Sequence, residues 1–324
     1  MASEAYRRLT SGQTRAAASR RLMDPIRDLG FEQEVQALRD YLHEWVQRSD
    51  AEIRPFLEWQ FGAGSKYFRP LTSFAVHMAK HGTRPTRECI IAAAAVEMLH
   101  NMSLVIDDIL DESEFRRSKR TLHAQFGPLP GLMTAGIITA DAFDIARNNP
   151  YLVSALAELV RRLGVAECRQ WRTRRSAASL KDWYLIAGED TGTMFEICAN
   201  VALGNDEMRR FGRLLGTLYH GCDDVSDVLG STALGGGGVE DMRDGIITLP
   251  MSIAIQDPAT AAAFTRGAPQ DLELLSGAVR RVLPAAIAEL DRIAAEARAE
   301  AARRCPYTEV LNALIDHTRA LAGQ

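Results

Sequence analysis

Apolar residues recur at three- and four-residue spacing from Phe31 onward, and no run of alternating β-branched residues interrupts them. This periodicity predicts amphipathic helices and leaves little room for strands. Ser179 and Asp182 have the spacing of a capping box, and Gly204 with Asn205 marks the end of one helix and the start of the next. We therefore predict long helices over residues 86–111, 131–149, 179–203, 206–229 and 270–303.

The same pattern bears on domain organisation. It contains no internal repeat and no interdomain linker, so it predicts one all-α domain over residues 31–324. Residues 1–30 include several arginines among Ser and Thr, and we prefer a disordered N-terminal tail to a transit peptide because no cleavage signal is evident. Four consecutive glycines at positions 235–238 predict a flexible loop.

Composition narrows the function. A chain of 324 residues that is 47% hydrophobic can bury a large core. Its net charge of −4 provides no basic surface of the kind that nucleic acid binding requires. The five cysteines form no CxxC pair and are expected to be reduced and buried. No apolar run approaches the ~18 residues of a membrane span, so we expect a soluble, cytoplasmic protein.

Three aspartates interrupt the end of a strongly apolar predicted helix. Asp107 and Asp111 are four residues apart and share one face, while Asp108 lies beside Asp111 at a spacing of three. Carboxylates in apolar sequence are costly unless a partner offsets their charge. The carboxylates on such a face repel one another, and a bound cation would relieve this repulsion. A single DDxxD motif fits a solvated helix face equally well.

A second predicted helix repeats this arrangement with Asp223, Asp224 and Asp227. Two such faces, opposed across a bundle, suit Mg²⁺, which takes one or two carboxylates and completes its octahedron with water and substrate phosphates. The implied ligand is a diphosphate. A cationic cluster follows the first motif, which fits either a phosphate site or a charged loop: Arg116, Arg117, Lys119 and Arg120.

These motifs resemble those of the trans-isoprenyl diphosphate synthases, in the same order, over residues 33–319. The family's GGKxxRP, its DDxxD followed by paired arginine, and its second DDxxD all have counterparts. The matching positions, in chain order, are 64–70, His100, 107–111, 116–117, 121–123, 223–227, 241–245 and 248–250. Five ordered motifs are difficult to obtain by chance.

The resemblance implies an all-α isoprenoid synthase fold, a bundle of long antiparallel helices around a central cavity, and a homodimer. It implies prenyl diphosphate substrates and three Mg²⁺ ions bound with the substrate diphosphate. The aspartates implied as metal ligands and catalytic residues are Asp107, Asp108, Asp111, Asp223, Asp224 and Asp227. The resemblance assigns the isopentenyl diphosphate site to Lys66, Arg69, His100 and Arg117, and the allylic diphosphate to Arg116. Taken singly, His100 also fits a core histidine, and Lys66 and Arg69 a surface loop.

Two positions depart from the family pattern. Asp190 and Ile246 stand where the family usually has lysines that hold the allylic diphosphate. The absence of these two cations should weaken binding of the allylic diphosphate, because a charge-assisted hydrogen bond contributes about 1.5–3 kcal/mol. Three hypotheses follow: a synthase with an altered allylic site, which we prefer; a terpene synthase or a prenyltransferase with an unusual acceptor; or a non-catalytic partner of an active synthase.

Chain length is expected to depend on the helix that precedes Asp107. Ser103 lies one turn below Asp107 and is flanked by Met102, where synthases of farnesyl length usually place an aromatic ring. The small serine side chain leaves room for the growing prenyl tail at this level. The larger Leu99 and Val96 would close that space further down. Geranylgeranyl diphosphate is therefore the preferred product, and farnesyl diphosphate is the fallback. The alternative is that Ser103 only lets two helices approach closely.

Overall fold

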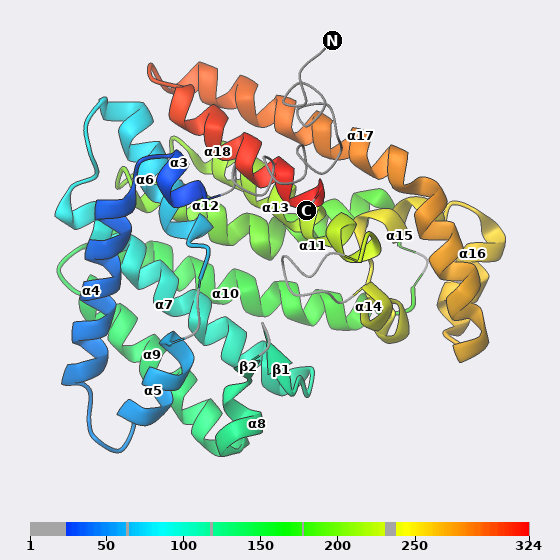
Figure 1. Cartoon of the computed structure of the whole chain (residues 1–324), viewed down its shortest axis with the longest axis horizontal. Helices are drawn as coiled ribbons and strands as arrows, with labels where there is room; N and C mark the ends of the chain where they lie inside the picture. Colours follow the sequence, from blue (N-terminus) through cyan, green and yellow to red (C-terminus); the bar gives the residue numbers. More distant parts are fainter. Residues whose placement is uncertain (1–23, 63–64, 117–118, 177, 231–237, 324) are drawn as a thin grey trace, which may run out of the picture.

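The computed structural model describes residues 24–62, 65–116, 119–176, 178–230 and 238–323 (Figure 1). Its α-helices are α3 (Pro25–Asp28), α4 (Glu32–Arg48), α5 (Arg54–Phe61), α6 (Phe68–His81), α7 (Arg87–Leu110), α8 (Leu122–Phe126), α9 (Pro128–Ala146), α10 (Pro150–Thr173), α11 (Leu180–Glu189), α12 (Thr191–Val201), α13 (Arg209–Val228), α14 (Gly238–Asp244), α15 (Leu249–Ala254), α16 (Pro258–Arg266), α17 (Leu272–Arg304) and α18 (Glu309–Ala320). Strands β1 (Phe115–Arg116) and β2 (Lys119–Arg120) form a short antiparallel pair. Two 3-10 helices complete the description, η1 (Pro269–Asp271) and η2 (Leu321–Gly323).

The all-α prediction is confirmed, and each of the predicted long helices has a counterpart. The predicted helix 179–203 is interrupted at Asp190, which ends α11 and precedes α12 with a non-helical ψ of −101°. The predicted capping box begins α11: the Asp182 carboxylate accepts a hydrogen bond from Ser179 N at 2.7 Å, and Ser179 Oγ accepts one from Asp182 N at 3.4 Å. The sequence pattern did not identify α10, which contributes to the cavity described below.

Two boundaries differ from the sequence prediction. Residues 24–30 belong to the fold, because the Asp24 side chain caps α3 and Leu29 is buried in the core. The predicted tail is therefore shorter than residues 1–30, of which 1–23 lie outside the described residues. The predicted glycine loop also lies mostly outside them, and its last residue, Gly238, begins α14.

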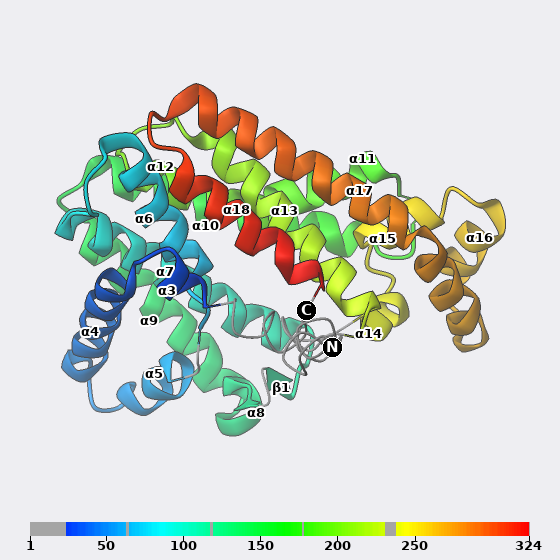
Figure 2. The ribbon, with the colours of Figure 1, turned by 45° about the horizontal axis from the view of Figure 1, so that its top comes forward.

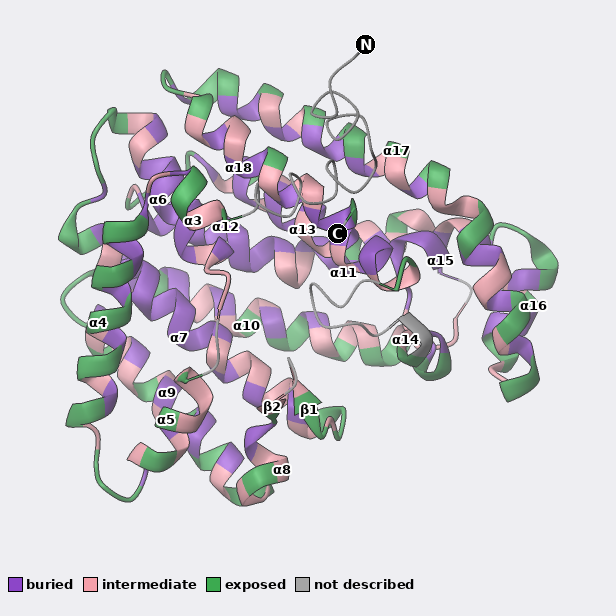
Figure 3. Cartoon of the chain, viewed as in Figure 1, coloured by how far each residue is buried: buried purple, intermediate pink, exposed green. Residues whose placement is uncertain are grey.

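The core is centred on α7, α12 and α13, which carry long stretches of buried residues (Figure 3). Helices α17 and α18 lie along α13 (Figures 1 and 2). Helices α12 and α13 approach closely because α13 has glycines where they meet: a Cβ on Gly212 would lie 2.5 Å from Phe195 O, and one on Gly216 would lie 2.6 Å from Thr191 O. This contact places the start of α12 against the face of α13 that leads to Asp223.

Two described helices, α7 and α9, are long and apolar enough to cross a membrane by length and composition, whereas no such run was expected from the sequence. In α7, 67% of the most apolar window is buried, as in the core helix of a soluble protein. Only 33% of the corresponding window of α9 is buried. The cysteine prediction is correct for four residues, whereas Cys168 is exposed.

Candidate active site

Two helices carry aspartates to one cavity of about 360 Å³. Asp107 lies near the end of α7 and Asp223 near the end of α13, and both line this cavity. Its apolar lining includes Val160 and Leu163 from α10 and Met194 from α12. We call this space the central cavity. The structure therefore brings together the two aspartate-bearing faces that were recognised separately in the sequence.

The first aspartates of both motifs lie in crowded, electronegative surroundings. Burial, and then the charges of Glu167 and Asp190, raise the pKa of Asp107 to about 8. Burial and the charges of Asp227 and Asp224 raise the pKa of Asp223 to about 7, against the positive charges of His220 and Lys66. A divalent cation would relieve this repulsion, so the donor set fits Mg²⁺.

Within the described residues, no three His, Cys, Asp or Glu side chains converge closely enough to hold a metal ion by themselves. Mg²⁺ is usually bound through one or two carboxylates while substrate phosphates and water supply the other ligands. Asp111 is exposed at the end of α7, and Asp227 lies one helical turn beyond Asp223.

The middle aspartate of each motif has a different environment. Asp108 Oδ1 accepts a hydrogen bond from Arg116 Nε at 2.8 Å. Asp224 Oδ2 accepts hydrogen bonds from Trp183 Nε1 at 2.8 Å and from the backbone N–H of Leu249 at 2.7 Å. Neither aspartate lines the central cavity, because one step along a helix turns the side chain by about 100°. Both side chains hold neighbouring segments in place, and the structure does not bring them to the predicted metal face.

Two predicted phosphate-binding cations lie near the second motif. Arg69 lines the central cavity, and its guanidinium lies 5.6 Å from the ring centroid of Phe195 and 5.9 Å from that of Tyr219. Lys66 is close enough for its charge to lower the pKa of Asp223. Both residues are therefore within electrostatic reach of the carboxylates.

Two other predicted binding residues, His100 and Arg116, lie between two cavities. His100 and Arg116 line both the central cavity and a second, larger one of about 530 Å³, between α4, α5, α7 and the β1–β2 hairpin. In this second cavity, Lys119 donates a hydrogen bond to Trp59 O and lies 4.3 Å from the Trp59 ring centroid. Arg117 lies outside the described residues.

A hydrogen-bonded group occupies the position of the first missing lysine. Thr191 Oγ1 lies 3.0 Å from His220 Nδ1, which is 3.5 Å from Asp190 Oδ2. Burial alone would lower the pKa of His220, but the charges of Asp224 and Asp190 outweigh it and raise the value to about 9. Burial alone would raise the pKa of Asp190, but the His220 hydrogen bond and charge hold it below its ordinary value. The cavity thus contains a histidinium–carboxylate pair.

Two further carboxylates have raised pKa values: Glu167, which the sequence analysis did not single out, and Asp241, which lies in the matching segment 241–245. Burial, and then the charges of Asp190 and Asp111, raise the pKa of Glu167 to about 7. Glu167 lines the central cavity from α10, where it continues the apolar stripe that contains Val160 and Leu163. Burial, and then the charge of Asp224, raise the pKa of Asp241 to about 8. Glu167 could have been identified from the sequence as a carboxylate at the end of an apolar stripe.

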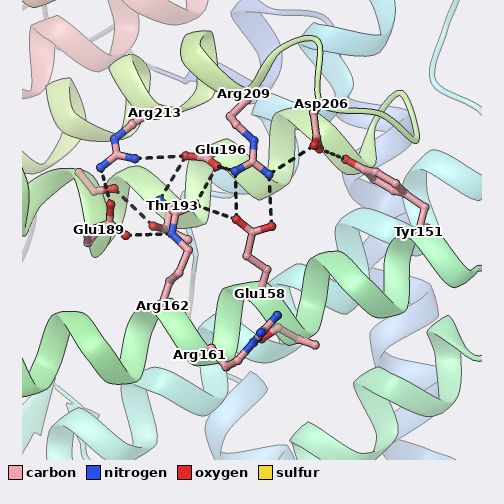
Figure 4. Close-up of polar contacts among 12 residues, drawn as sticks. Tyr151, Glu158, Arg161, Arg162, Glu189, Thr193, Glu196, Asp206, Arg209 and Arg213 are labelled. Carbon is pink, nitrogen blue, oxygen red and sulfur yellow. Dashed lines mark hydrogen bonds and ion pairs between the residues drawn. The ribbon is translucent and has the colours of Figure 1, made fainter.

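An ion-pair network behind the cavity holds α10, α11, α12 and α13 together (Figure 4). Arg162 donates hydrogen bonds to Glu158 at 3.1 Å, Glu189 at 2.9 Å, and Glu196 at 2.8 and 3.3 Å. Arg209 adds a second cation beside Glu158 and Glu196. Because Glu189 directly precedes Asp190 in the chain, the network fixes the interruption between α11 and α12.

Of the α7 residues predicted to limit the length of the prenyl product, some line the central cavity and others do not. Ser103 and Met102 line the central cavity, and Ser103 Oγ donates a hydrogen bond to His100 O at 2.9 Å. Leu99 and Val96 are fully buried and line neither cavity, so they do not close the central cavity as predicted. Leu163 of α10 and Met194 of α12 belong to the apolar lining of the central cavity.

Comparisons with known proteins agree with this geometry. A family model described as polyprenyl synthetase matches residues 50–273. Nonaprenyl diphosphate synthase of Mycobacterium tuberculosis is 29% identical over 260 residues, which are 74% of this chain and 76% of that protein. Geranylgeranyl pyrophosphate synthase 4 of Arabidopsis thaliana is 27% identical over 271 residues, which cover 74% and 72% of the two chains.

Solved structures show the same fold. A polyprenyl synthase from Caulobacter crescentus, complexed with calcium and isoprenyl diphosphate, has a TM-score of 0.81 at 23% identity and covers 93% of this chain and 97% of its own. Heptaprenyl diphosphate synthase from Staphylococcus aureus has a TM-score of 0.81 at 17% identity, with coverage of 90% and 98%. The arrangement of helices in this chain is therefore that of the all-α isoprenoid synthases.

Proposed function

The chain belongs to the polyprenyl synthetase family of prenyltransferases, and from that premise we propose that it condenses an allylic prenyl diphosphate with isopentenyl diphosphate to give a longer trans-prenyl diphosphate. One observation carries the proposal: α7 and α13 present Asp107 and Asp223 to a single cavity. Arg69 from α6 completes a polar end, and side chains from α10 and α12 supply an apolar wall. This combination fits a substrate with a diphosphate head and a hydrocarbon tail.

Mg²⁺ belongs to this proposal. Asp107 and Asp111 would hold it on α7, and Asp223 and Asp227 on α13, with three ions in all by resemblance to the family. When bound with substrate, the ions supply the positive charge that stabilises the departing diphosphate. Asp108 and Asp224 are not included, because neither lines the central cavity and each is hydrogen-bonded to a neighbouring segment.

The protein's own residues bind and orient the two substrates. Lys66, Arg69 and His100 bind the diphosphate of isopentenyl diphosphate, and the apolar wall orients the allylic tail. The allylic carbon–oxygen bond breaks and its electron pair leaves with the diphosphate. The double bond of isopentenyl diphosphate then forms the new carbon–carbon bond, and loss of a proton restores neutrality at carbon.

We propose geranylgeranyl diphosphate as the product. Ser103 leaves the cavity open one turn below Asp107, and Leu163 and Met194 are part of its apolar lining. The named relatives make products of different lengths, from geranylgeranyl to nonaprenyl diphosphate, so product length depends on this chain's own cavity wall.

One observation favours a second candidate, a terpene synthase or a transfer to another acceptor. Asp190 replaces a family lysine, and its carboxylate faces the cavity in a pair with His220. An anion at this position disfavours the allylic diphosphate and suits a positively charged carbon skeleton. A synthase of this kind would ionise one prenyl diphosphate and need no isopentenyl diphosphate.

A homodimer also belongs to the proposal. Helix α9 exposes large apolar side chains near its start, with relative exposures of 67% for Leu129, 49% for Leu132 and 54% for Met133. A contiguous apolar surface of this kind is typical of subunit interfaces. Sedimentation analysis tests this point, since Leu132→Glu should yield monomers if α9 forms the interface.

The decisive experiment is incubation of the purified protein and Mg²⁺ with geranyl, farnesyl or geranylgeranyl diphosphate, with and without isopentenyl diphosphate. A longer prenyl diphosphate formed only in the presence of both substrates supports the proposal. A hydrocarbon or alcohol released from the allylic substrate alone favours the second candidate. No turnover of any substrate, with all motifs intact, rejects both.

Variants sharpen the assignment of the isopentenyl diphosphate site. Lys66→Ala and Arg69→Ala should raise KM for isopentenyl diphosphate more than KM for the allylic partner, because each removes a cation from that site. Lys181→Ala, at an exposed position on α11, is the matched control and should change neither constant. Equal increases in both KM values would contradict the assignment.

A further inference from the structure

The central cavity has a deficit of positive charge for its proposed allylic substrate. Four carboxylates, those of Asp107, Glu167, Asp190 and Asp223, line it. The positions of the two family lysines hold Asp190 and Ile246. Mg²⁺ offsets part of this charge, yet a diphosphate also needs directional donors, which arginine supplies best through its planar fork.

A short segment after α10 places an arginine beside Asp111, the last aspartate of the first motif. We call Arg174, Arg175 and Ser176 the strap. The Arg174 guanidinium lies 3.4 Å from Asp111 Oδ1 and 5.1 Å from the ring centroid of Trp171. Its charge also acts on Glu167 inside the cavity. Arg174 therefore lies beside the first aspartate motif, close enough for its charge to act on a carboxylate that lines the cavity.

The strap is attached to the turn that precedes Ile246. The backbone N–H of Arg175 donates to Gly245 O at 2.9 Å, and its guanidinium donates to Arg243 O. A Cβ on Gly245 would lie 2.8 Å from Arg175 N, so only glycine permits this approach. Gly245 also has a φ of +73°, which disfavours other residues. The strap is thus held beside the position that lacks its lysine.

The Arg174 guanidinium has a hydrogen-bond donor that is not used within the described part of the protein. Its Nε is buried and has no hydrogen-bond partner, and its contact with Asp111 is long for an ion pair between such groups. The side chain is only 28% exposed, so it is already largely desolvated and stacked on Trp171. A guanidinium held in this way binds an incoming diphosphate without a large ordering cost.

We propose that Arg174 binds the allylic diphosphate and replaces the cation that the family places at the position of Ile246. This inference rests on the proposed use of an allylic diphosphate, whichever reaction follows. Arg174 is then a residue that touches substrate, and Arg175 is a positioning residue that attaches the strap to Gly245. Isopentenyl diphosphate, which is assigned to Lys66 and Arg69, is not expected to depend on Arg174.

Calorimetric titration with a non-ionising thiolo analogue of geranyl diphosphate, in the presence of Mg²⁺, tests the proposal. Arg174→Ala and Arg174→Gln should weaken analogue binding about 10- to 100-fold, as expected for one charge-assisted hydrogen bond to a desolvated anion. Arg174→Lys should recover part of the loss because it keeps a charge but not the fork. Arg172→Ala, at an exposed position in the last turn of α10, should bind within twofold of wild type.

Kinetics separate a binding role from a structural one. Arg174→Gln should raise KM for the allylic substrate while KM for isopentenyl diphosphate and the melting temperature stay unchanged. Analogue binding within twofold of wild type in both Arg174→Ala and Arg174→Gln would overturn the inference, as would equal increases in both KM values. If the wild type binds the analogue but never consumes isopentenyl diphosphate, the condensation proposal fails while the Arg174 comparison still decides this one.

Discussion

Removing the Arg162 side chain should destabilise the fold, and the size of the effect follows from what it leaves behind. Arg162 is 17% exposed and bonds to three carboxylates, of which Glu196 is 1% exposed (Figure 4). Breaking a buried pair by removing one partner costs about 3–5 kcal/mol. Arg209 Nη1 still lies 2.9 Å from Glu196 Oε1, so we expect the lower end, about 3 kcal/mol.

That free energy corresponds to a measurable change in melting temperature. With an unfolding entropy of about 2.1 cal/mol/K per residue, a chain of this length gives roughly 0.6–0.7 kcal/mol per degree, so Arg162→Ala should melt about 5 °C below wild type. Arg161→Ala is the matched control, because Arg161 is exposed and its Nε donates only to Ala157 O in its own helix, at 3.1 Å. It should change the melting temperature by less than about 1 °C.

Differential scanning calorimetry distinguishes lost charge from lost packing. Arg162→Met keeps the apolar stem, so it should lose nearly as much stability as Arg162→Ala if the unpaired carboxylates cause the loss. Adding Glu196→Gln to Arg162→Met should then recover part of it, since the buried charge is gone. Equal melting temperatures for Arg162→Ala and Arg161→Ala would refute the reasoning, and no recovery in the double variant would assign the effect to packing.

Three further predictions concern the cavity. Asp107→Ala or Asp223→Ala should abolish Mg²⁺-dependent turnover but keep the helical circular dichroism, because each removes a ligand and little core volume. Substantial remaining turnover would contradict a metal site formed by the aspartates of both helices. Ser103→Phe should shorten the product with turnover retained, as chromatography of the product chains would show, whereas lost stability with unchanged product length would mean that Ser103 is only a helix contact. With EDTA present, the melting temperature should fall as the pH rises from 5 to 8.5. Burial and neighbouring carboxylates raise the folded-state pKa of Asp107 and Asp241 to about 8, so their contribution is complete below about pH 4 and is lost as the pH rises through 8. Asp241→Asn should reduce this slope, and an unchanged slope would exclude Asp241 as a source.

The sequence by itself determined the helical class and the faces that carry the first aspartate of each motif. Helical periodicity is local, so the spacing of Asp107 from Asp111 and of Asp223 from Asp227 already defined one face on each helix. The capping box at Ser179 was equally local, because a cap depends on residues three positions apart. These features need no knowledge of which helices become neighbours.

Only the tertiary structure decided which carboxylates and cations share a cavity. Asp108 and Asp224 look like metal ligands in the sequence, yet Asp108 bonds to Arg116 eight residues away and Asp224 to Trp183 and Leu249, which are far apart from it in sequence. Glu167 and the Asp190–His220 pair reach the cavity because α10 and α12 pack against α7 and α13.

The position of Arg174 has the same origin, since its strap is attached to a turn about 70 residues further along the chain. Such placements depend on close approaches between segments far apart in sequence, as at Gly216 and Gly245. Side-chain spacing along one helix contains no information about them, because the free energy that creates them comes from packing between helices.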